Sequence, residues 1–296
     1  MTSGPGYLRV TRASAQSRAE PRALSNYWRP RVTTAAVQLE RRRYMQQAVA
    51  IVTGAASGIG RGIAGYLAEQ GVSVVVADVR DDEGEGAAQE LVKQGANALY
   101  VHTDVTKKAE VEALVATAAE RFGRLDYLVN NAGVVTMTPF LELPEEEWDR
   151  VVDIDLKGQF LCAQAFAKEV IRQQHGGAIV NIGTVESEVV SASGEHCQVH
   201  YNAAKGGVKM LTKGIAFELA PYNIRVNGIN PGTIQTGFAG EIADSPQVME
   251  HLMRRALIKR VGQPVDIARV AWFLLGDDAG YMTGTMVNVD GGWLVT

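Results

Sequence analysis

Residues 53–60 of the 296-residue chain read Thr-Gly-Ala-Ala-Ser-Gly-Ile-Gly, between the apolar run Ala48–Val52 and the helical pattern Ile59–Gln70. A strand, a glycine-rich turn and a helix in this order are typical of a dinucleotide-binding unit. Glycines allow the tight turn, and the free N–H groups at the helix start bind a pyrophosphate. The spacing Gly-x-x-x-Gly-x-Gly also fits an ordinary tight turn. The residues predicted to hold the pyrophosphate are Gly54, Ser57, Gly58, Ile59 and Gly60.

Short apolar strands and helical patterns continue to alternate after this turn. Further strands are expected at Val72–Ala77, Ala98–Val101, Leu125–Val129, Ala178–Ile182, Ile224–Ile229 and Met286–Val289, and further helices at Gly86–Gln94, Val111–Phe122, Trp148–Gln174 and Tyr201–Leu219. Strands this apolar and β-branched are buried on both faces. The alternation predicts one α/β domain, residues 45–296, with a Rossmann-type doubly wound parallel sheet, helices on both faces and right-handed crossovers.

The second expected strand ends at Asp78, 18 residues after Gly60. A carboxylate at this place accepts hydrogen bonds from the adenosine ribose hydroxyls and repels a 2′-phosphate. Asp78 therefore favours NAD over NADP. Two observations leave an alternative open: Arg80 could turn toward a phosphate, and Asp78 could merely cap a turn.

Charge is distributed unevenly along the chain. Residues 1–44 contain nine arginines, no lysine and two glutamates, a net charge of +7, and the remainder has 20 basic and 31 acidic residues, a net charge of -11. The acidic body argues against a nucleic-acid surface. The two cysteines, Cys162 and Cys197, suit a reducing compartment. The sequence contains no run of about 18 apolar residues, the length that a membrane-spanning helix needs. We expect a cytoplasmic protein.

Residues 1–44 lack a sustained apolar period and are predicted to be a basic, disordered extension. Three interpretations remain open. Met45 precedes the first strand at once, so the extension could be non-native or reflect a misassigned start. Its Arg-rich and Ser-rich composition also suits organellar targeting, although it lacks the apolar core of a secretory signal. It could finally be an arm that binds a partner.

Further motifs follow the glycine-rich turn in a fixed order. Asp104-Val105 follows the third strand, Asn130-Asn131-Ala132-Gly133 the fourth, Tyr201-Asn202-Ala203-Ala204-Lys205 opens a helix, and Pro231-Gly232 with Ile234 and Thr236 follows the sixth strand. With the turn, they resemble the short-chain dehydrogenase/reductase family, subgroup of about 250 residues, from Met45 to the C-terminus. The resemblance implies that these segments contact the adenine, the nicotinamide ribose and the carboxamide. The cofactor residues that it adds are Asp104, Val105, Asn131, Ala132, Gly133, Tyr201, Lys205, Pro231, Gly232, Ile234 and Thr236.

Tyr201 and Lys205 lie four residues apart on an expected helix, so both side chains lie on one face. A free tyrosine, with a pKa of about 10, is a poor base at neutral pH, and a nearby ammonium lowers its pKa. Such a tyrosine can take the proton of an alcohol while hydride leaves for the nicotinamide. As in the family, Lys205 is also expected to hold the nicotinamide ribose.

Two positions depart from the family. Where it has a serine that hydrogen-bonds the substrate oxygen, this chain has Thr184, with Ser187 as the rival. Where it has an asparagine that holds a water behind the lysine, this chain has Asp155. We expect Asp155 to stabilise the lysine cation and so to weaken the lowering of the tyrosine pKa.

The stretch before Tyr201 is longer than the family's and polar. It contains Glu186, Ser187, Glu188, Ser191, Ser193, Glu195, His196, Gln198 and His200. If it faces the substrate rather than solvent, a polyol, sugar or hydroxy acid is expected. Its spacing matches no metal motif, so no metal is expected. The segment Gly237–Ile258 would be a short lid, which disfavours a large substrate.

The predicted function is an NAD-dependent oxidoreductase that interconverts a secondary alcohol and a ketone. One alternative is a 3-oxoacyl-acyl-carrier-protein reductase that uses NADPH. Another is a nucleotide-binding regulator that has lost catalysis. From the resemblance of the C-terminal Tyr281–Gly284 and Val289–Gly292 segments to the family's last strand and its flanks, we expect a homotetramer or homodimer.

Overall fold

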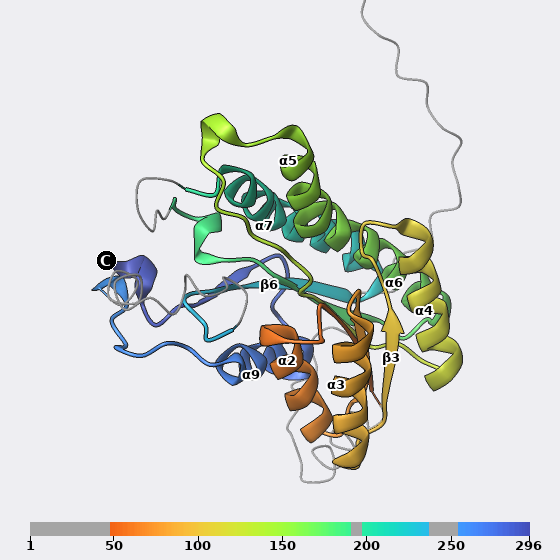
Figure 1. The fold of residues 1–296 in the computed structure, drawn as a ribbon. Helices are drawn as coiled ribbons and strands as arrows, with labels where there is room; N and C mark the ends of the chain where they lie inside the picture. Colours follow the sequence, from red (N-terminus) through yellow and green to blue (C-terminus); the bar gives the residue numbers. More distant parts are fainter. Residues whose placement is uncertain (1–47, 191–196, 237–253) are drawn as a thin grey trace, which may run out of the picture. The chain divides into compact units, whose positions relative to one another are not determined.

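Seven parallel strands form the central sheet of the computed structural model, which describes residues 48–190, 197–236 and 254–296 (Figure 1). The strands are β1 Val49–Thr53, β2 Ser73–Asp78, β3 Ala98–His102, β4 Tyr127–Asn130, β5 Gly177–Ile182, β6 Ile224–Pro231 and β7 Met286–Val289. Their order is β3-β2-β1-β4-β5-β6-β7, and each neighbouring pair is parallel. The predicted doubly wound parallel sheet is confirmed.

Helices cover both faces of this sheet because successive strand side chains point to opposite sides. Ala50 and Val52 of β1 pack with one set of helices, and Val49 and Ile51 pack with the other. The first set is α2 Gly58–Glu69, α3 Asp81–Lys93 and α9 Pro264–Leu275, and the second is α4 Lys108–Phe122, α6 Gly158–Gln173 and α7 Val199–Leu219. Figure 1 shows α2 and α9 on one side of the sheet, opposite α6 and α7.

Three helical predictions differ from the structure. The expected single helix Trp148–Gln174 is α5 Glu145–Val152, the π-helical turn η3 Asp153–Lys157 and then α6. Helix α3 begins at Asp81 and not at Gly86, since three acidic residues in its first turn favour the positive end of the helix dipole. Helix α9 was missed, although Gln263 and Asp266 form a capping box around Pro264.

Several sequence predictions lie outside the described residues. They concern the basic extension, the loop residues Ser191, Ser193, Glu195 and His196, and residues 237–253 of the expected lid. Within the described part, none of the helices combines the length and the apolar character needed to cross a membrane.

The strand order reverses between β1 and β4, which are neighbours in the sheet but not in the chain. In such sheets ligands bind outside the carboxyl ends of the strands, where the order reverses. Thr53 ends β1 and Asn130 ends β4, so the glycine-rich turn and the Asn-Asn-Ala-Gly segment meet at this edge.

Candidate active site

The glycine-rich turn has the backbone that a phosphate site requires. Gly54 and Gly58 have φ angles of 63° and 58°, in the region that favours glycine. A Cβ atom on Gly60 would lie 2.3 Å from the carbonyl oxygen of Gly54, so the helix approaches the turn too closely for any side chain. Ser57 at the N-cap of α2 makes no side-chain capping bond, which leaves the first N–H groups of the helix available to an anion. These observations fit the diphosphate of a dinucleotide.

The Asn-Asn-Ala-Gly segment holds this turn in place. The Asn131 side-chain amide donates to the carbonyl oxygens of Thr53 (2.9 Å) and Gly54 (3.0 Å). The Thr53 hydroxyl accepts from the backbone N–H groups of Asn131 (3.0 Å) and Ala132 (3.1 Å). The Asn131 amide thus supports the glycine-rich turn directly. The structural role of Thr53 was not anticipated from the sequence.

Asp78 lies at the end of β2 and is only 6% exposed. Its carboxylate accepts from the N–H of Ala56 at 3.0 Å and forms an ion pair with Arg80 at 3.2 Å. Arg80 also donates to the Ser57 hydroxyl at 2.8 Å and so bridges the strand end and the glycine-rich turn. The hydrogen bond with Asp78 raises the pKa of Arg80, against the effect of burial. Carboxylate and guanidinium therefore both lie at the end of β2, next to the glycine-rich turn.

The other predicted cofactor segments lie at the same edge of the sheet. Asp104 uses its carboxylate locally, accepting from the N–H of Thr106 at 3.0 Å, while Val105 is buried. After β6, Thr236 comes close to the glycine-rich turn: a Cβ atom on Gly58 would lie 3.4 Å from the Thr236 Cβ. The remaining residues, Pro231, Gly232 and Ile234, link the end of β6 to Thr236.

Tyr201 and the two candidate hydroxyls meet beside the end of β5. Thr184 caps the 3-10 turn η4 Val185–Ser187, and its hydroxyl lies near enough to the Tyr201 hydroxyl to lower the pKa of that phenol. Ser187 instead donates to Oδ1 of Asn230 at 3.2 Å. Thr184 is thus placed to share a substrate oxygen with Tyr201, and Ser187 faces β6. This geometry favours Thr184 for the hydroxyl role.

Lys205 and Asp155 form a buried ion pair behind Tyr201. The Lys205 Nζ lies 3.0 Å from Oδ2 of Asp155 and donates to the carbonyl of Ile182 at 3.2 Å. Asp155 is 0% exposed, and its Oδ1 accepts from the N–H of Val134 at 2.8 Å. Burial raises the pKa of Asp155, and the charge of Lys205 opposes this shift. The expected stabilisation of the lysine by Asp155 has a direct geometric basis, and the π turn η3 places Asp155 there.

The pKa of Tyr201 differs from the expected lowering. Burial raises it well above its usual value, and the charges of Asp155 and Glu186 add to that effect, while Thr184 lowers it. Lys205 Nζ lies 5.6 Å from the centre of the Tyr201 ring and already has a carboxylate partner. In this state the phenol keeps its proton at neutral pH, so it is suited to donate a proton to a ketone.

Two further titratable residues near Tyr201, Glu186 and His200, were given no catalytic or cofactor role from the sequence. Burial raises the pKa of Glu186 to about 7. His200 is fully buried; its Nε2 lies 2.6 Å from the Thr136 hydroxyl, and its Nδ1 has no hydrogen-bond partner among the described residues. Burial lowers the pKa of His200, against the charge of Glu147. Both residues belong to the polar stretch that was expected to face the substrate.

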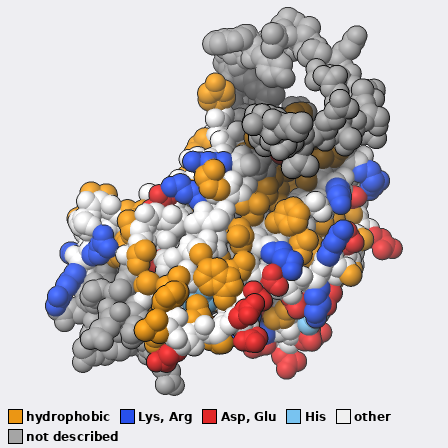
Figure 2. Space-filling view, turned by 90° about the horizontal axis from the view of Figure 1, so that it is seen from above, with side chains coloured by type: hydrophobic (Ala, Val, Ile, Leu, Met, Phe, Trp, Pro, Cys, Tyr) orange, Lys and Arg blue, Asp and Glu red, His pale blue; other side chains and the backbone are white. Residues whose placement is uncertain are grey.

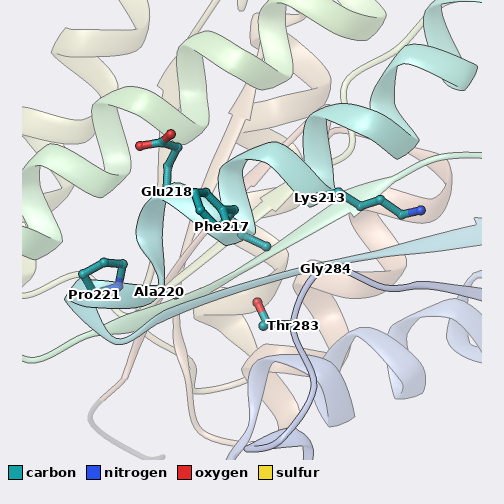
Figure 3. Close-up of a pocket in the computed structure, with 8 residues that line it drawn as sticks. Lys213, Phe217, Glu218, Ala220, Pro221, Thr283 and Gly284 are labelled. Carbon is teal, nitrogen blue, oxygen red and sulfur yellow. The ribbon is translucent and has the colours of Figure 1, made fainter.

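A separate hollow of about 610 Å³ lies at the other end of α7 (Figure 3). It is lined by Lys213, Ala216, Phe217, Glu218, Ala220, Pro221, Thr283 and Gly284. None of these is a predicted catalytic or cofactor residue. Within the described ranges, no group of three or more His, Cys, Asp or Glu side chains is arranged to hold a metal ion.

Comparison with known proteins supports the chemistry of this site. A family model described as enoyl-(acyl carrier protein) reductase matches residues 54–294. The chain is 38% identical over 245 residues to the cyclopentanol dehydrogenase of Comamonas sp. (strain NCIMB 9872), a match that covers 83% of this chain and 96% of that protein. It is 39% identical over 244 residues to the 3-oxoacyl-acyl-carrier-protein reductase of Staphylococcus aureus (strain Mu50), with 82% and 96% covered.

A solved structure has the same fold. The crystal structure of a short-chain type dehydrogenase/reductase from Mycobacterium marinum superposes with a TM-score of 0.79 at 33% sequence identity. The superposition covers 84% of this chain and 96% of that one.

Proposed function

The chain belongs to the short-chain dehydrogenase/reductase family, and we propose that it is an NAD-dependent enzyme that interconverts a secondary alcohol and a ketone. As a member of the family it is an oxidoreductase that acts on CH–OH groups with a nicotinamide cofactor. The finer proposal concerns the cofactor and a polyol, sugar or hydroxy acid as substrate. A polar stretch beside Tyr201 supports that substrate class.

One observation carries the proposal: the hydroxyl of Thr184, just after β5, lies near enough to Tyr201 to act on its pKa, and Lys205 Nζ lies 5.6 Å from the centre of the Tyr201 ring. The two hydroxyls can hold one substrate oxygen between them. In reduction Tyr201 donates its phenol proton to the ketone oxygen, and in oxidation the phenolate, formed once the phenol has lost that proton, takes the alcohol proton. The nicotinamide, when bound, accepts or supplies the hydride. The ion pair of Lys205 and Asp155 holds a positive and a negative charge in place behind the phenol.

A substrate screen tests the proposal directly. Polyols, sugars and hydroxy acids would be incubated with the enzyme and NAD, and NADH would be followed by its absorbance. We expect at least one of these classes to give alcohol-dependent NADH. Failure of every alcohol with both NAD and NADP would instead support the nucleotide-binding regulator.

The proposed preference for NAD depends on Asp78. We expect Asp78→Asn to raise the ratio of kcat/KM with NADP to that with NAD by about tenfold or more, because it removes a charge that repels a 2′-phosphate. Steady-state kinetics with both cofactors measures this ratio. Arg80→Ala is the matched control: it should change the ratio less than Asp78→Asn. If the native enzyme prefers NADP and Arg80→Ala removes that preference, the proposal is wrong.

An NADPH-dependent reductase of 3-oxoacyl groups is the second candidate. The position of Arg80 favours it, since the guanidinium bridges Asp78 and Ser57 at the ribose end of the site. The likeness to the Staphylococcus aureus reductase is of similar strength to the likeness to the dehydrogenase. Activity on a 3-oxoacyl thioester with NADPH would favour this candidate.

A homotetramer or homodimer is also proposed, and the outer face of α7 supports it. Met210 is 63% exposed and Phe217 is 80% exposed, seven residues apart on one side of the helix. A Cβ atom on Gly206 or Gly214 would meet nothing, so a second helix could approach closely there. On the face that includes α5 and α7, hydrophobic side chains gather in several groups (Figure 2).

We expect the double variant Met210→Lys/Phe217→Lys to lower the molecular mass in solution, because two charges would have to be buried in the interface. Light scattering measures the mass. Leu141→Lys is the control, since Leu141 is 94% exposed and lies on η2 Phe140–Glu142 rather than on α7. A native monomer would contradict the proposal.

A further inference from the structure

Glu186 is the central residue of the 3-10 turn η4, which Thr184 caps. Its backbone N–H and its backbone carbonyl each form a hydrogen bond with a side chain of the site. Its N–H donates to the Thr184 hydroxyl at 3.3 Å, and its carbonyl accepts from the Asn202 side chain at 3.3 Å. Asn202 follows Tyr201 on α7. The turn is thereby tied to Thr184 and to the residue that follows Tyr201.

The neighbours of Glu186 on the turn point away from that oxygen. Val185 packs with Ala256 and Trp293, and Ser187 donates to Asn230 on β6. Because a 3-10 helix has three residues per turn, consecutive side chains are about 120° apart. The Glu186 side chain therefore points in a third direction, about 120° from each of the other two. The charge of its carboxylate raises the pKa of Tyr201.

Within the described residues, the Glu186 carboxylate has no hydrogen bond and no ion pair. Burial is the cause of its raised pKa. Its near neighbour Glu188 is paired with Lys209 at the surface at 2.5 Å. A half-buried carboxylate without a partner is costly unless something donates hydrogen bonds to it. Next to the substrate oxygen, the donors available would be other hydroxyls of the substrate.

We propose that Glu186 is the specificity-determining residue of the site: its carboxylate accepts hydrogen bonds from a second hydroxyl of a neutral polyol or sugar and disfavours substrates that have a carboxylate. This inference rests on the proposed function and narrows it, since hydroxy acids are then poor substrates. Hydrogen bonds to a charged acceptor are about twice as strong as those between neutral groups, and like charges repel.

The test compares three substrates at pH 8.5, where a carboxyl with a pKa of about 7 is ionised. Xylitol is the neutral polyol, xylonate the matched acid, and cyclohexanol a secondary alcohol without a second polar group. In Glu186→Gln we expect kcat/KM for xylitol to fall about tenfold and that for xylonate to rise, with cyclohexanol changed by less than about threefold. Glu188→Gln, the control, should change none of the three.

An equal fall for all three substrates in Glu186→Gln would overturn the inference while the proposed function stands, and so would an unchanged ratio of xylitol to xylonate. If the native enzyme oxidises no alcohol, the proposed function fails and binding decides the role of Glu186. In that case, xylitol or xylonate would be titrated into the native enzyme in the presence of NADH, and calorimetry would measure the two affinities. Tighter binding of xylitol, lost in Glu186→Gln, supports the inference, and equal or tighter binding of xylonate overturns it.

Discussion

Replacement of Tyr201 by phenylalanine is expected to lower kcat by about a hundred- to ten-thousandfold, the range that general acid–base catalysis contributes. The variant loses the one hydroxyl that can move the proton but keeps the ring, which is 9% exposed and packed in the site. The affinity for NADH should stay the same, because phenylalanine keeps the ring, and the bonds that hold the glycine-rich turn come from Thr53 and Asn131. Steady-state kinetics and a fluorescence titration with NADH measure the two quantities.

Two alanine variants serve as companions in this assay. Thr184→Ala should lower kcat/KM strongly, since it removes the hydroxyl that lowers the pKa of Tyr201, whereas Ser187→Ala should have a small effect because Ser187 bonds to Asn230. Retained turnover in Tyr201→Phe would exclude the proposed role of the tyrosine. A larger loss in Ser187→Ala than in Thr184→Ala would reverse the assignment of the two hydroxyls.

Lys205→Met is expected to abolish most turnover and also to lower the free energy of unfolding by about 3–5 kcal/mol, the cost of leaving one member of a buried ion pair alone. Asp155 and Lys205 are 0% and 3% exposed, and their charged groups lie 3.0 Å apart. Methionine has a similar length and keeps the packing, so the loss of stability reports on the unpaired carboxylate. Urea unfolding at pH 7 measures it.

The double variant Lys205→Met/Asp155→Asn separates stability from catalysis. It has no unpaired charge at this place, so most of the lost stability should return, while turnover should stay low because the lysine is still missing. If the single variant is as stable as the native protein, the ion pair does not have the structural weight assigned to it. If the double variant regains turnover, Lys205 has no direct part in the reaction.

The fold could be predicted from the sequence because its determinants are local. The first strand is a short apolar run, and the glycines with positive φ follow it directly in the turn. Tyr201 and Lys205 share a helix, so their common face follows from spacing alone. Helix boundaries were less accurate: the acids at the start of α3 and the capping box of α9 were present in the sequence but were not used.

The long pattern Trp148–Gln174 shows where local reasoning ends. Its apolar spacing fits one helix, but the structure inserts the π turn that carries Asp155. Whether that carboxylate meets Lys205, 50 positions further along the chain, depends on how α6 and α7 pack on the sheet. The same holds for Thr184 and Ser187, whose directions follow from the turn after β5 and from the adjacent β6.

Sequence by itself determined the class of this protein: a parallel α/β sheet, a glycine-rich turn between the first strand and helix, and a tyrosine–lysine pair, all encoded by neighbours within a few residues. Only the tertiary structure decided the electrostatics of the site. Burial and the charges of Asp155 and Glu186 raise the pKa of Tyr201, although a lysine four residues away predicted the reverse. The physical reason is that a pKa depends on solvent exclusion and on every charge nearby in space, and the chain brings these together only when it folds.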